Sequence, residues 1–124
     1  MKYGEVGDNM TILYNRRSIC MGDDVYNGIY KIVMPDDAGL DDLVDVLLHG
    51  GCGNTWSIPQ TSDIGWVIYS NIGKIADVSP DLKTVVYCNM DKDTKLSALN
   101  IKWVFGERTG ETPDISSIAK RFGQ

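Results

Sequence analysis

The chain has 124 residues, of which 43% are hydrophobic and 23% charged, a balance typical of one domain with its own core. Its net charge of −5 argues against a nucleic-acid partner, because such binding depends on clustered lysine and arginine. No stretch approaches the roughly 20 apolar residues of a membrane span, and the first ten residues contain no apolar signal segment. We therefore expect a single cytoplasmic domain over residues 1–124, with residues 1–9 as a loosely ordered lead-in and no membrane partner.

Short strands are predicted in the first third of the chain. Two β-prone runs, Thr11–Tyr14 and Ser18–Met21, are separated by three polar residues, which is the length of a hairpin connection. Gly28–Met34 predicts a third strand. Pro35 is expected to end this strand, because proline has no backbone N–H group for a further ladder bond.

Residues 40–49 predict the main helix. Its apolar side chains recur at helical spacing and would form one face, made of Leu40, Leu43, Val44, Leu47 and Leu48. Its polar side chains would lie together on the other side, and they are Asp41, Asp42, Asp45 and His49. Asp36 and Asp37 precede the helix, where carboxylates can cap it, and Gly50 and Gly51 follow it, where a left-handed cap favours glycine.

The second half of the chain predicts a run of strands and a short helix. The predicted strands are Gly65–Ser70, Lys74–Val78, Thr84–Cys88 and Ala98–Phe105. In the last strand, one face would hold Leu99, Ile101, Trp103 and Phe105. Thr112 is the expected N-cap of a helix that reaches Phe122. Since consecutive strands have connections too short for parallel crossovers, we expect an α+β domain: an antiparallel sheet of about six to seven strands, one main helix packed on it and a short C-terminal helix.

Catalytic and metal-binding patterns are incomplete. His49 is the only histidine, and its predicted place on the polar side of a helix favours a surface role near Asp45. Together with His49, the three cysteines Cys20, Cys52 and Cys88 would suffice in number for zinc, but only His49 and Cys52 are closely spaced. Buried small side chains are the simpler interpretation of the cysteines.

Two further motifs also depart from their functional patterns. Asp91 begins a segment that resembles a calcium loop, but Leu96 replaces the glycine at its sixth position and Lys102 the glutamate at its twelfth. The glycine-rich residues 50–54 follow a predicted helix, whereas a phosphate-binding loop precedes one. We therefore expect no enzymatic activity, no cofactor and no bound metal.

Acidic residues are concentrated near the predicted helix. Between residues 23 and 45 the chain has a single cation, Lys31, against Asp23, Asp24, Asp36, Asp37, Asp41, Asp42 and Asp45. These carboxylates could simply form a solvated face that keeps the domain soluble. They could also form a surface that meets a basic partner, because complementary charge speeds encounter and disfavours wrong partners.

The segment 17–25, which contains Gly22, Asp23 and Asp24, is followed by the main helix, by Thr55 and Trp56, and by the strands that begin at Trp66. From Thr11 to Phe105, this order resembles small bacterial immunity proteins of contact-dependent growth inhibition and other polymorphic toxin systems. The resemblance implies an acidic partner of one cognate toxin, which it neutralises by covering the active site or substrate surface. It implies no catalytic residues.

Our leading hypothesis is therefore a non-enzymatic immunity protein for a toxin with a basic active-site surface. Its expected partner-binding residues are Asp23, Asp24, Asp41, Asp42, Asp45 and His49. The alternative is a small metal-dependent hydrolase or nuclease that uses the clustered aspartates. A third possibility is a homo-oligomer with Trp56 or Trp103 exposed at its interface.

Overall fold

A computed structural model describes residues 9–16, 29–49, 58, 63–88 and 90–123. Several sequence predictions lie outside these residues. They are the strand Ser18–Met21 and the residues Cys20, Asp23, Asp24, Cys52 and Trp56.

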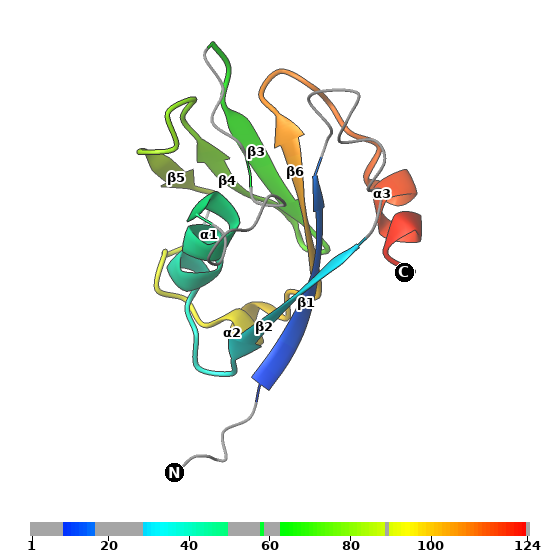
Figure 1. Cartoon of the computed structure of the whole chain (residues 1–124). Helices are drawn as coiled ribbons and strands as arrows, with labels where there is room; N and C mark the ends of the chain where they lie inside the picture. Colours follow the sequence, from blue (N-terminus) through cyan, green and yellow to red (C-terminus); the bar gives the residue numbers. More distant parts are fainter. Residues whose placement is uncertain (1–8, 17–28, 50–57, 59–62, 89, 124) are drawn as a thin grey trace.

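The described residues form one six-stranded sheet with helices on both faces, so the predicted α+β class is confirmed (Figure 1). The strands are β1 (Asn9–Arg16), β2 (Tyr30–Pro35), β3 (Trp66–Ser70), β4 (Gly73–Val78), β5 (Val85–Tyr87) and β6 (Trp103–Arg108). The helices are α1 (Leu40–His49), α2 (Leu96–Leu99) and α3 (Ile115–Arg121). Within this described part of the chain, no helix has the length and apolar character needed to span a membrane.

The strand order is β2-β1-β6-β3-β4-β5, and one pairing departs from the expected antiparallel sheet. β1 and β6 run parallel, with Leu13 opposite Trp103, whereas the other neighbours pair antiparallel. Short connections require antiparallel pairing only between consecutive strands, and β1 and β6 are far apart in the sequence. The sheet is therefore mixed. The last residue of the predicted lead-in, Asn9, already belongs to β1, because it pairs with Pro35.

Helix α1 covers one face of the sheet and forms the larger core with it. The predicted helix is confirmed, because α1 spans Leu40–His49 and buries the five apolar side chains named above. They pack with inward side chains of the sheet such as Ile12, Trp66 and Ile68, all with no exposed surface. Each such side chain contributes about 1.5–3 kcal/mol through burial, so α1 is a rigid part of the domain.

Helix α3 covers part of the other face. The rings of Phe122 and Trp103 stack with centroids 4.9 Å apart, and Ile118 and Phe105 complete this small cluster. Trp103 is only 1% exposed, so the idea that it forms an exposed dimer interface is wrong. The predicted N-cap is also wrong by two residues, because Asp114 caps α3 by accepting hydrogen bonds from the N–H groups that follow it.

The predicted strand Ala98–Phe105 is wrong in its first half. Residues 96–99 form the helical turn α2, and Asn100 adopts a left-handed conformation with φ 57° and ψ 40°. The side chain of Asn71, in the β3–β4 turn, holds this corner by donating to the carbonyl of Asn100 at 2.9 Å and accepting from the N–H of Lys102 at 2.6 Å. As a result Ile101 joins the α1 side of the core, whereas Trp103 joins the α3 side.

Candidate functional site

The outer side of α1 presents the predicted polar residues. Asp42, Asp45 and His49 are exposed and Asp41 is half-buried at the margin of the apolar face. The Nε2 atom of His49 lies 3.6 Å from Oδ1 of Asp45, and the side chains are 63% and 75% exposed, respectively. The predicted surface position of His49 beside Asp45 is therefore confirmed, and solvent screens the interaction between them.

Two of these carboxylates also support the start of α1. Oδ2 of Asp42 accepts a hydrogen bond of 2.9 Å from the N–H of Gly39, the residue before the helix. Oδ1 of Asp41 accepts from the N–H of Asp42 at 3.0 Å. The Asp42 contact corresponds to one half of a capping box, in which an acidic side chain of the first turn satisfies the N-cap N–H. Asp45 and His49 make no such contact with the helix backbone and are more available to a partner.

A distant segment, residues 91–96, docks on the N-terminal end of α1. The carbonyl of Thr94 accepts from the N–H of Leu40 at 2.9 Å, and the carbonyl of Lys92 accepts from the N–H of Asp41 at 2.7 Å. The N–H of Leu96 in turn donates to the carbonyl of Ala38 at 3.0 Å. These bonds satisfy N–H groups that a helix start otherwise leaves without a partner. They also bring Asp91 and Asp93 next to the acidic residues of α1.

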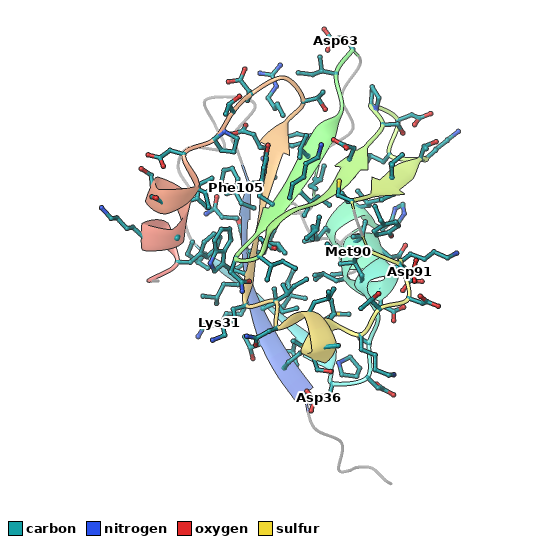
Figure 2. The ribbon with its side chains drawn as sticks, turned by 180° about the vertical axis from the view of Figure 1, so that it is seen from behind. Lys31, Asp36, Asp63, Met90, Asp91 and Phe105 are labelled. Carbon is teal, nitrogen blue, oxygen red and sulfur yellow. The ribbon has the colours of Figure 1, made fainter. Side chains whose placement is uncertain are left out.

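We call this region the acidic surface. It is exposed except for the half-buried Asp41, and it consists of Asp36, Asp37, Asp41, Asp42, Asp45, Asp91 and Asp93. Figure 2 shows Asp91 beside α1 and Asp36 at the end of β2. Lys92 and Lys95 lie in the docked segment, and the Lys95 ammonium donates to the carbonyl of Asp37 at 3.3 Å. Carboxylates outnumber cations here, so this end of the molecule is strongly negative.

Strand β5 lies beside the acidic surface. Burial raises the pKa of the Tyr87 hydroxyl, and the negative charges of Asp41 and Asp45 raise it further. Tyr87 therefore lies within electrostatic reach of both α1 carboxylates. Its side chain packs against the larger core, and Figure 1 shows β5 next to α1.

The described residues offer few groups for covalent or metal chemistry. No three histidine, cysteine, aspartate or glutamate side chains among them converge as metal ligands would. Cys88 is half-buried, with its Sγ atom 3.9 Å from Oδ2 of Asp77. Burial raises the pKa of the Cys88 thiol, which disfavours the reactive thiolate. Asp77 itself is paired with Lys74 at 2.9 Å.

The sequence did not predict Asp91 and Asp93 as parts of the acidic surface, or Tyr87 as a residue next to it. Their local pattern predicts only a turn and a strand end, and the pairing of Gly39 with Lys95 that joins the two segments has no local signal. Asp23 and Asp24 stay predictions, since they lie outside the described residues. Comparison of the chain with family models, curated proteins and solved structures finds no match.

Proposed function

We propose that this chain is a non-enzymatic immunity protein that binds a cognate bacterial toxin and covers its active site or substrate surface. The observation that supports the proposal most directly is the acidic surface, which two distant segments build together around the start of α1. A concentrated negative surface favours a partner with a positive one, because complementary charge accelerates encounter and penalises wrong partners.

A toxin that acts on nucleic acid fits this surface best. Enzymes of that kind carry lysine and arginine along the groove that receives the phosphate backbone. Exposed carboxylates such as Asp45, Asp91 and Asp93 can occupy the same cationic groove and exclude the substrate. The partner is therefore proposed to bind through its basic active-site surface.

The rigidity of α1 also supports a binding role. Five side chains anchor the helix in the core, and hydrogen bonds from residues 92 and 94 hold its first turn. A surface that is ordered before binding loses little conformational entropy on association. The carboxylates of α1 are thus presented in a fixed arrangement.

The proposal is tested by a growth assay in a heterologous bacterial host. Each gene that neighbours the one encoding this chain is induced with and without this chain. We expect one neighbour to arrest growth and this chain to restore it. If no neighbouring product is toxic, or if this chain fails to restore growth, the proposal is wrong.

Charge reversal then locates the interface. The double variant Asp45→Lys and Asp91→Lys spares the Asp42 contact at the helix start. It should slow association with the toxin by about tenfold or more and weaken the salt dependence of the rate, because electrostatic steering is lost. Stopped-flow mixing at low and physiological ionic strength measures both the association rate and its salt dependence.

The matched control is Asp63→Lys with Glu111→Lys, which changes the net charge equally at exposed sites outside the acidic surface. Equal rates for the two double variants would remove the acidic surface from the interface.

A calorimetric titration separates this proposal from the hydrolase alternative. The purified chain is titrated with Mg²⁺, Mn²⁺ and Zn²⁺ in turn. We expect no stoichiometric binding, because the described aspartates serve caps, turns and the surface and do not converge. A stoichiometric site with micromolar affinity, together with turnover of a nucleic-acid or ester substrate, would favour the enzyme instead.

A further inference from the structure

Among the strands that the structure describes, β5 forms one edge of the sheet and pairs with β4 alone. The carbonyl of Thr84 accepts from Ser79 and the N–H of Cys88 donates to Ile75, so these residues turn their backbone groups toward β4. Because backbone groups alternate in direction along a strand, Val85 and Tyr87 turn theirs outward. Within the described residues, no backbone or side-chain group outside β4 bonds to the N–H or C=O of either residue. This edge therefore has free donors and acceptors.

The two sides of β5 differ in chemistry. Val85 and Tyr87 lie opposite Val78 and Ala76 on the α1 side of the sheet, where Asp41 and Asp45 act on Tyr87. On the other side, Val86 is 58% exposed. It lies directly opposite Asp77 and borders a shallow pocket with mixed polar and apolar lining, which also includes Pro80 and Thr109. An added strand would thus meet the carboxylates of α1 on one face. On the other face it would meet exposed Val86 beside the Asp77–Lys74 ion pair.

The opposite edge of the sheet is less suited to strand addition. β2 carries the exposed cation Lys31 and ends in Pro35, which has no N–H to donate. Charged side chains and proline are common protections of edge strands against pairing. The three residues of β5 include no proline and no charged side chain.

We propose that β5 receives an extended segment of the toxin as an added strand. In this segment, cationic side chains would face Asp41 and Asp45 while alternate apolar side chains would contact Val86 and the adjacent pocket. Backbone bonds to Val85 and Tyr87 would supply affinity, and the alternating side chains would supply specificity. The inference rests on the proposed function, since it takes the basic toxin as the partner and assigns the part of it that binds.

The test uses the full chain, labelled with ¹⁵N, and a short end-blocked peptide in which valine and lysine alternate. We expect amide shifts and slower hydrogen exchange at Val85 and Tyr87 on binding. Two peptide controls need no variant of the protein. One has the same composition in separate valine and lysine blocks, and the other is N-methylated at alternate residues so that it cannot donate to the edge. Each should bind at least about tenfold more weakly.

Two variants test the same contacts from the side of the protein. Val85→Pro removes an outward N–H without removing a bond to β4, and the pair Asp41→Asn and Asp45→Asn removes the charges near Tyr87. Each should weaken peptide binding by about tenfold, whereas Asp63→Asn with Glu111→Gln should not. The inference is wrong if the alternating peptide does not bind, if it binds without changes at β5, or if the blocked and N-methylated peptides bind equally well.

The growth assay separates this inference from the proposed function. If Asp45→Lys with Asp91→Lys abolishes protection while Val85→Pro retains it fully, the immunity role stands and strand addition is wrong. If the peptide binds β5 as expected but no neighbouring product is neutralised, the edge binds strands and the immunity role is wrong. Loss of protection in both variants, with both still folded by circular dichroism, supports both proposals.

Discussion

Helices α1 and α3 cover opposite faces of the same sheet, yet they depend on it to different degrees. α1 has ten residues and buries five apolar side chains in the larger core. α3 has seven residues, and Ile118 is the only one of its described side chains that is buried in the smaller cluster. Phe122, the residue that follows the helix, is buried in the same cluster. Helices this short are marginal without tertiary contacts. We therefore expect α1 to be part of the framework that holds the acidic surface, and α3 to be a cover that opens while the framework stays folded.

The largest expected effect is in α1. Leu47 has no exposed surface, and Leu47→Ala should lower the free energy of unfolding by about 2–5 kcal/mol, because it leaves a cavity in the larger core. Denaturant unfolding followed by far-UV circular dichroism measures the change. The exposed substitution Asp45→Ala on the same helix is the control and should stay within about 0.5 kcal/mol of the parent. A loss below about 1 kcal/mol for Leu47→Ala would mean that α1 is not a framework element.

A smaller effect is expected in α3. Phe122→Ala removes the ring stacked on Trp103, and the short helix can then separate from the sheet. We expect a loss of about 1–2 kcal/mol, less than the usual cost of a core phenylalanine, because relaxation of α3 limits the cavity. The tryptophan emission of the chain should also shift to longer wavelength, because Trp103 becomes more exposed. If Phe122→Ala lowers the free energy of unfolding as much as Leu47→Ala does, both helices belong to one cooperative unit, and α3 does not open separately from α1.

The smallest effect concerns pH. The carboxylate of Asp114 accepts hydrogen bonds from the Ser117 hydroxyl at 2.8 Å and from the N–H of Ser116 at 3.1 Å. The bonds to Ser117 contribute most, and together these contacts lower the pKa of Asp114. A lowered pKa means that this stabilisation is present above the ordinary aspartate pKa and is lost as the pH falls through the lowered value. Acidification should therefore weaken this cap and make opening of α3 more frequent.

Hydrogen exchange at Ile118 and Phe122 measures this opening, since both N–H groups bond within α3. In Asp114→Asn the pH dependence should disappear while the cap is kept, because asparagine is also a good N-cap. Amides of α1 serve as the internal reference. If the α1 amides lose protection at the same pH as the α3 amides, the two helices open together, and the expected difference between them is wrong.

The elements that sequence reasoning predicted well are those with a local cause. α1 follows from a helical apolar period, and its first turn carries the carboxylate that caps it. The error at Ala98–Lys102 has a distant cause. Alternating apolar residues there fit a strand, but Asn71 from another turn holds Asn100 in a left-handed corner and moves Ile101 and Trp103 to opposite faces.

The residues of the candidate site also differ in whether their position has a local or a distant cause. Asp45 and His49 were predicted because one helical period places them on one side of α1. Asp91 and Asp93 were not, because their position depends on backbone bonds between residues 92–96 and the residues around Gly39. Spacing along the chain contains no information on such a contact, and the turn-like composition around Asp91 fits many positions in a fold.

The position of β6 has a consequence for how the molecule assembles. β6 lies between β1 and β3, so it is the only described strand that joins the β1–β2 hairpin to the β3–β4–β5 meander (Figure 1). On the ribosome, these two halves must wait until synthesis has passed Arg108 before a continuous sheet can form. Such long-range closure slows folding. Until β6 closes the sheet, the nascent chain has exposed strand edges in both halves. During this interval the chain is most accessible to chaperones and most able to form wrong strand pairs.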